Sequence, residues 1–166
     1  KKMSNLITAT FKTRQAAEHS LRELEAFGIT DEQTALIVTD ETRGKSFQIK
    51  EGTKMDEGAA GGATAGGIIG ALMGTMATAT AVAIPGLNIV VAGAAISSLA
   101  GLGAGAAAGG LIGALAGAGI PEHEAKIYEE ELKEGSILLA IEAEDKDQKD
   151  QVKKVLQKED AYHLAA

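Results

Sequence analysis

Apolar and polar residues near the start of the chain follow the pattern of a strand, a helix and a second strand. The stretch "SNLITATF" alternates and is rich in β-forming residues, which predicts a strand. Thr13 is placed to cap a helix over "RQAAEHSLRELEAFG", and Gly28 to end it. Four apolar residues share one face of this predicted helix, namely Ala17, Leu21, Leu24 and Phe27. The run "TALIVTD" then predicts the second strand.

The end of the chain repeats this order. "GSILLAIEAE" after Gly135 predicts a strand, "DKDQKDQVKKVLQKED" a helix, and "AYHLAA" a short last strand. The apolar stripe of that helix consists of Val152, Val155 and Leu156, and an earlier predicted helix, "EHEAKIYEEELKE", has an inner stripe of Ala125, Tyr128 and Leu132. We therefore expect an α+β fold, a ferredoxin-like split βαβ sandwich with four antiparallel strands and two helices on one face. This domain is discontinuous, comprising residues 1–57 and 120–166.

The middle of the chain has a different character, because no charged residue occurs from Gly58 to Pro121. Small residues recur there every four positions, in two series: Gly58, Gly62, Gly66, Gly70 and Gly74, then Gly93, Ser97, Gly101, Gly105, Gly109, Gly113 and Gly117. The two series come into register if the chain folds back between Pro85 and Gly86. We therefore predict an inserted antiparallel α-helical hairpin over residues 58–119, with a glycine zipper between its arms.

Bulky residues are predicted to face away from the partner arm, at Ile68, Leu72 and Met76 on the first arm and Val91, Leu99, Leu111 and Leu115 on the second. Glycine costs about 1 kcal/mol relative to alanine within a helix, so such arms need close packing or a bilayer around them. When rows of small residues at four-residue spacing pack against each other, the two helices cross at a steep angle. Helices that cross steeply separate after a few turns. The outer glycines are therefore expected to contact neighbouring hairpins, which implies a homo-oligomer.

Composition and charge narrow the classes of partner. The 166 residues carry a net charge of −7, which argues against nucleic acid, since phosphate binding requires a basic surface. The chain has no cysteine, which fits a reducing cytoplasm and excludes thiolate chemistry. We expect a cytoplasmic protein, with association with a membrane as the alternative.

Motifs for catalysis or cofactor binding are weak. Gly44, Lys45 and Ser46 resemble the end of a phosphate loop, but Thr39 stands where the first glycine belongs, and the downstream "SFQIK" is strand-like. His19, His123 and His163 are far apart in sequence, so they form no metal motif. We expect no enzymatic activity, no cofactor and no metal.

Three segments of the chain are distinctive: "TFKTRQAAEHSLRELEAFGI", "IPGLNIVVAGA" at the predicted turn, and "GLIGALAGAGIPEHEAKIYEEELKEGSILLAIEA". They resemble segments of the bacterial general stress proteins, specifically the heat-induced type with a glycine-zipper domain of unknown function. It implies a stress-related protein whose cytoplasm-facing domain carries an apolar hairpin.

Two functions from different classes remain open. The first is a self-assembling structural protein in which hairpins of several copies pack together. The second is a membrane protein whose hairpin enters the bilayer from the cytoplasmic side.

Overall fold

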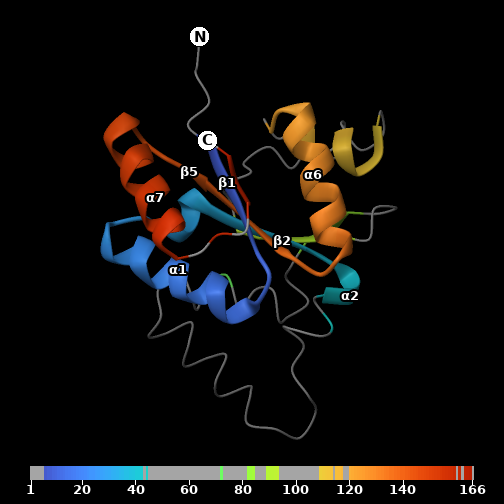
Figure 1. Ribbon diagram of the computed structural model, residues 1–166, viewed down its shortest axis with the longest axis horizontal. Coiled ribbons are helices and arrows are strands. Elements are labelled where there is room, and N and C mark those ends of the chain that lie inside the picture. The colour runs from blue at the N-terminus through green and yellow to red at the C-terminus, as the bar shows by residue number, and fades with distance from the viewer. Residues whose placement is uncertain are drawn as a thin grey trace, which may run out of the picture.

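The computed structural model describes residues 6–42, 44, 72, 82–84, 89–93, 109–113, 115–117, 120–159, 161 and 163–165 (Figure 1). They form an α+β fold. In chain order the elements are β1 (Leu6–Phe11), α1 (Arg14–Ala26), the 3-10 turn η1 (Asp31–Gln33), β2 (Thr34–Thr39), α2 (Asp40–Thr42), β3 (Val82–Ile84), β4 (Ile89–Gly93), α6 (Glu122–Lys133), β5 (Ile137–Glu142), α7 (Lys146–Lys158) and β6 (His163–Ala165).

One antiparallel sheet joins the two ends of the sequence. Its six strands lie in the order β3-β4-β2-β5-β1-β6. In the centre β5 pairs with β1, with Ile7 opposite Ile141, and with β2, with Leu36 opposite Leu139. The short strand β6 pairs with residues 8–10 of β1, with Ala9 opposite Leu164. Segments more than 100 residues apart in sequence are thus neighbours in the sheet.

The sheet separates two hydrophobic cores. On one face, α1 and α7 cover a core to which alternate residues of β1, β2, β4 and β5 contribute. On the other face, α6 and the helical residues 109–113 and 115–117 cover the remaining residues of β2, β4 and β5. Figure 1 shows these layers, with α1 and α7 to the left of the sheet and α6 to the right.

The second helical layer differs from the expected arrangement, in which helices lie on one face only. The second layer is explained by β2 and β5, because the first five residues of each strand are all buried. A strand with one solvated face alternates between apolar and polar residues, whereas "ALIV" in β2 and "ILLAI" in β5 are continuous apolar runs. Both faces of these strands therefore need a covering layer, and α6 supplies the second one.

Helix α1 begins after Thr13 as the sequence predicts and ends at Ala26, two residues before Gly28. The Thr13 side chain accepts a hydrogen bond from the backbone N–H of Ala16, and Gly28 follows the helix with a φ of 92°. The left-handed backbone at Gly28 suits a residue without Cβ. The inner stripe is confirmed for Ala17, Leu21 and Leu24, which are fully buried.

Phe27 is the exception, because its side chain is 50% exposed rather than buried. The prediction placed it on the inner face by continuing the helical period past Leu24. The helix ends at Ala26, however, and Phe27 is its C-cap with a φ of −91° and a ψ of 7°. The period no longer applies there, so the ring turns away from the core.

The predicted stripes of α6 and α7 are both confirmed. Ala125, Tyr128 and Leu132 of α6 are buried against the sheet, as are Val152, Val155 and Leu156 of α7. Helix α7 starts at Asp145, whose carboxylate accepts from the backbone N–H of Gln148 at 2.8 Å. Such a cap satisfies one of the N–H groups that a helix N-terminus leaves unpaired.

Candidate functional site

The candidate site is the uncharged middle segment, of which the structure describes only parts. Of the predicted zipper and turn residues, Gly93, Gly109, Gly113 and Gly117 are described. The others lie outside the described residues, namely Gly58, Gly62, Gly66, Gly70, Gly74, Ser97, Gly101, Gly105, Pro85 and Gly86. The predicted boundaries near 57–58 and 119 also fall outside them.

Near its predicted turn the segment forms strands and not helices, so the prediction of helical arms there is wrong. β3 and β4 pair antiparallel, with Ile84 opposite Ile89, and β4 pairs with β2, with Gly93 opposite Ala35. The chain does reverse direction between Ile84 and Ile89, as predicted. The β-branched Val and Ile residues on both sides of the reversal favour a β-hairpin over a helix, and the β2 edge gives this hairpin a partner.

The same strands overturn the assignment of Val91 to an outward face. Val91 is 1% exposed and belongs to the core beneath α6. Leu72, also predicted to face outward, is 1% exposed and belongs to the core beneath α1 and α7. These apolar side chains are covered by the chain's own sheet and helices.

Residues 109–113 and 115–117 are helical, as expected for the second arm. Leu111 and Leu115, predicted to face away from the partner arm, are buried in the core shared with α6 and the sheet. The small residues Gly109 and Gly117 are exposed, and Gly113 is half-buried. The glycine row of this helical segment therefore lies on the outside of the molecule.

Gly109 has no close neighbour in the described part of a single chain. A Cβ built on it would have no atom within 4 Å outside the local helix backbone. The predicted close approach of another helix at Gly109 is thus not made there by any described residue of the same copy.

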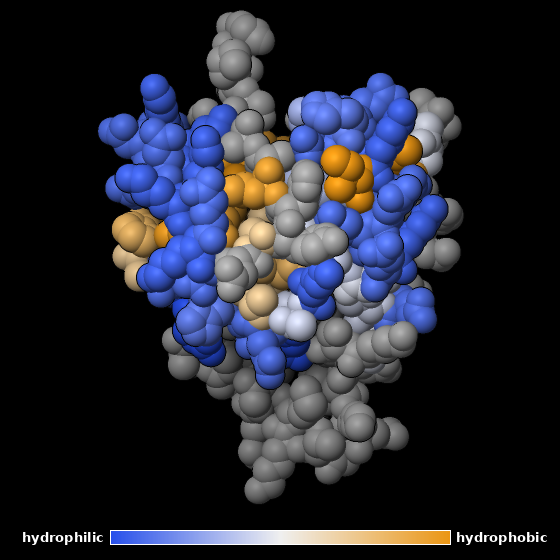
Figure 2. Space-filling view, in the orientation of Figure 1, coloured by the Kyte–Doolittle hydropathy of each residue, from blue (hydrophilic) through white to orange (hydrophobic). Residues whose placement is uncertain are grey.

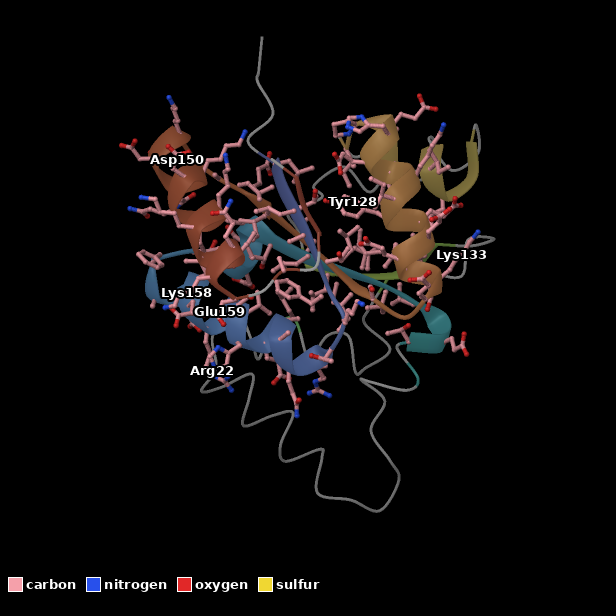
Figure 3. All side chains as sticks on the ribbon, in the orientation of Figure 1. Arg22, Tyr128, Lys133, Asp150, Lys158 and Glu159 are labelled. Carbon is pink, nitrogen blue, oxygen red and sulfur yellow. The ribbon has the colours of Figure 1, made fainter. Side chains whose placement is uncertain are left out.

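A buried polar cluster, hereafter the polar seam, lies between β1 and α6 and comprises Thr8, Thr10, Tyr128 and Glu131. The Tyr128 Oη lies 2.6 Å from the Thr8 Oγ1 and donates to the Thr8 carbonyl at 3.3 Å. The Thr10 hydroxyl donates to a Glu131 carboxylate oxygen at 2.5 Å. Figure 3 shows Tyr128 pointing from α6 toward β1. All four residues are buried, so these bonds satisfy polar groups that water cannot reach.

The polar seam is poorly suited to acid–base chemistry near neutral pH. Burial raises the pKa of Tyr128 above its ordinary value of 10.0; the hydrogen bond with Thr8 lowers it, and the negative charges of Glu124 and Glu131 raise it further. A catalytic acid or base works best when its pKa is near the operating pH. Tyr128 therefore stays protonated and serves to hold α6 on the sheet.

Two of the three histidines, His19 and His123, have side chains that the structure describes, and each contacts a glutamate. The imidazole of His19, 65% exposed, contacts Glu159 at 2.9 Å, and that of His123 contacts the adjacent Glu124 at 3.1 Å. Both are surface contacts. Within the described ranges, no three His, Asp or Glu side chains are placed to hold a metal ion. Of the phosphate-loop residues only Gly44 is described.

In the part of the chain that the structure describes, none of the helices has the length and apolar character needed to cross a bilayer. Comparison of the chain with protein-family models, with curated proteins and with solved structures finds no match.

Proposed function

We propose that this protein is a non-enzymatic, self-assembling protein whose uncharged middle segment joins copies of the chain into a homo-oligomer. The observation that carries this proposal is the orientation of the helical residues 109–113 and 115–117. Their leucines are buried in the chain's own core, while Gly109 and Gly117 are exposed. Small residues at four-residue spacing allow another backbone to approach closely. A second copy is the partner that carries the same row of small residues.

We further propose that the domain bearing this segment is a ferredoxin-like split βαβ sandwich. The order β2-β5-β1-β6 and its antiparallel pairing support this assignment. So does the placement of α1 and α7 on one face. β3 and β4 extend the sheet beside β2 and bring the middle segment to its edge. A link to stress rests on the resemblance to the general stress proteins, and a cytoplasmic location rests on that resemblance and on the absence of cysteine.

The test is the particle mass of the full chain, measured by analytical ultracentrifugation without detergent. Gly117→Leu places a bulky side chain on the exposed glycine row and is expected to reduce the particle mass. Ala116→Leu is the matched control, because Ala116 is exposed on the same helical segment but lies off the row. Circular dichroism of both variants checks that the fold is retained. Equal particle masses for the two variants would contradict the proposal.

The bilayer is the alternative partner, favoured by the absence of charge from Gly58 to Pro121. Flotation of the purified chain with vesicles of neutral lipid distinguishes the two. Self-assembly predicts large particles that stay at the bottom of the gradient, whereas membrane insertion predicts that the protein floats with the lipid.

A further inference from the structure

Two helices on opposite faces of the sheet, α6 and α7, carry opposite net charges. Helix α7 has five lysines against two aspartates, a net charge of +3. Helix α6 has five glutamates against two lysines, a net charge of −3. Of these glutamates only Glu131 is buried, so the remaining charge of α6 is directed toward the solvent.

The outward charges of both helices are accessible to a partner. Glu130 on α6 and Lys154 on α7 are exposed, and neither forms an ion pair within the described residues. Lys133 pairs with Glu129 at 3.7 Å and Lys158 with Glu23 at 3.9 Å, both at exposed sites where such pairs are weak. Figure 2 shows mostly hydrophilic residues on the two helical flanks of the face in view, with a few hydrophobic residues among them. These weak pairs can exchange partners at little cost.

The two helices cannot meet within one copy, because α7 covers one face of the sheet and α6 the other. Figure 3 places Lys158 and Asp150 on one flank of the molecule and Lys133 on the opposite flank. If two copies are stacked sheet over sheet in the same orientation, however, the face covered by α6 in one copy meets the face covered by α7 in the next. Helix α6 of one copy then lies beside α7 of the other. Such a contact is heterologous, and its repetition gives a ring or a filament.

We propose that copies of this chain dock head to tail, with the acidic outer face of α6 against the lysine-rich outer face of α7 in the next copy. This inference rests on the proposed self-assembly and names the second surface that it uses. The whole chain has a net charge of −7, so copies repel one another in most orientations. The pairing of α6 with α7 is the orientation in which opposite charges face each other.

Exposed ion pairs contribute little affinity, so the middle segment has to supply most of it. Complementary charge acts mainly on the rate and the orientation of docking. Steering of this kind changes association rates by about 10-fold to 1,000-fold and falls steeply with ionic strength. Assembly is therefore expected to be fast at low salt and to slow as salt screens the two faces.

The first experiment reverses one charge on each face of the full chain. Glu130→Lys and Lys154→Glu are each expected to slow assembly about tenfold at low ionic strength, as measured by stopped-flow light scattering. An equimolar mixture of the two variants should recover part of the rate, since the altered faces attract each other. The differences should vanish at about 1 M salt, where the Debye length is about 3 Å. Rates that equal the wild-type rate at low salt would overturn the inference.

The second experiment identifies which faces touch, and the absence of cysteine from the chain makes it clean. Glu130→Cys and Lys154→Cys are prepared separately, assembled together and oxidised. Head-to-tail docking predicts disulfide-linked pairs containing one copy of each variant, resolved by mass spectrometry with one variant isotope-labelled. Cross-links only between identical variants would overturn the inference, because they indicate an isologous contact.

The two proposals fail in different ways. A wild-type chain that stays monomeric contradicts the proposed self-assembly and, with it, the α6–α7 contact. Assembly that responds to Gly117→Leu but not to either charge reversal contradicts the head-to-tail contact alone. Loss of binding to anionic vesicles in Lys154→Glu, with assembly unchanged, would assign the lysines to a lipid surface and would also overturn it.

Discussion

The hydroxyl groups of Tyr128 and Thr8 lie 2.6 Å apart in the layer between α6 and β1, although the two residues are separated by 120 positions in sequence. Tyr128 also donates to the carbonyl oxygen of Thr8. This contact joins the helix that covers the second face of the sheet to a central strand. Together with the bond between Thr10 and Glu131, it fixes the position of α6 along β1.

The bond between Tyr128 and Thr8 should appear as a coupling energy. Tyr128→Phe leaves the buried Thr8 hydroxyl without its partner and is expected to lower the free energy of unfolding by about 1–3 kcal/mol. Thr8→Val is expected to cost less, because the Tyr128 hydroxyl keeps the carbonyl of residue 8 as its acceptor. The double variant removes both hydroxyls and should cost less than the sum of the single costs. Urea denaturation of the four proteins measures this. Strictly additive costs would mean that the two side chains act independently.

Tyr128 should also shape stability at alkaline pH. Its pKa is raised in the folded state, so between pH 10 and the folded pKa the unfolded chain binds fewer protons than the folded one. The contribution of Tyr128 to the free energy of unfolding is therefore fully present below pH 10. It decreases by about 1.4 kcal/mol per pH unit as the pH rises from 10 to the folded pKa. Tyr128→Phe should therefore show a shallower decline above pH 10 in chemical denaturation. An identical decline in both proteins would contradict the burial of this phenol.

The local elements could be predicted from the sequence because short-range patterns determine them. Thr13 and Gly28 mark the ends of α1, and the stripes of α6 and α7 follow the helical period. Phe27 was misplaced because the helical period does not indicate at which residue the helix ends. The strands β3 and β4 were missed because the four-residue recurrence of glycine outweighed a shorter signal, the β-branched residues Val82, Ile84, Ile89, Val90 and Val91 around a turn.

For the candidate site, periodicity separates the two faces of a helix but does not tell which face lies inside. The spacing put Gly109 and Leu111 on different faces, and the structure buries the leucine because α6 and the sheet offer it an apolar surface. The polar seam was missed altogether. Thr8 and Thr10 look like the solvent face of an alternating strand, and their partners on α6 are about 120 residues away.

Among the described residues, the Ser20 hydroxyl is buried without a hydrogen-bond partner, and removing it should stabilise the fold. Ser20 on α1 is fully buried, and its hydroxyl forms no hydrogen bond with the described part of the structure. Ser20→Ala removes this group and has a better helix propensity, so the free energy of unfolding is expected to rise by about 1 kcal/mol.

Thr13→Ala serves as the opposing control on the same helix. It removes the cap that accepts from Ala16, and is expected to lower the free energy of unfolding by about 1 kcal/mol. Thermal unfolding followed by circular dichroism compares the two variants with the wild type. A Ser20→Ala protein less stable than the wild type would show that the hydroxyl has a partner.

Glycines at two positions should respond to alanine in opposite ways. Gly135 ends α6 with a φ of 103°, a backbone conformation that alanine adopts only with strain. Gly135→Ala is therefore expected to lower the free energy of unfolding by about 1–2 kcal/mol. Gly109 lies in a helical segment with open space around its Cα, so Gly109→Ala should leave the fold as stable or stabilise it by about 0.5–1 kcal/mol.

The informative measurement combines stability with particle mass in the same two variants. If a second copy packs on the exposed glycine row, the added methyl group of Gly109→Ala fills the space that the neighbouring backbone needs. The particle mass should therefore fall. The unfolding temperature should not fall, because the chain itself stays folded. Gly135 lies at the end of α6, away from that row, and Gly135→Ala should lower the unfolding temperature and keep the particle mass at temperatures where the fold is intact. If Gly109→Ala instead lowers the unfolding temperature and leaves the particle mass unchanged, glycine at this position is needed by the fold of the single chain. The glycine row would then have no part in joining copies.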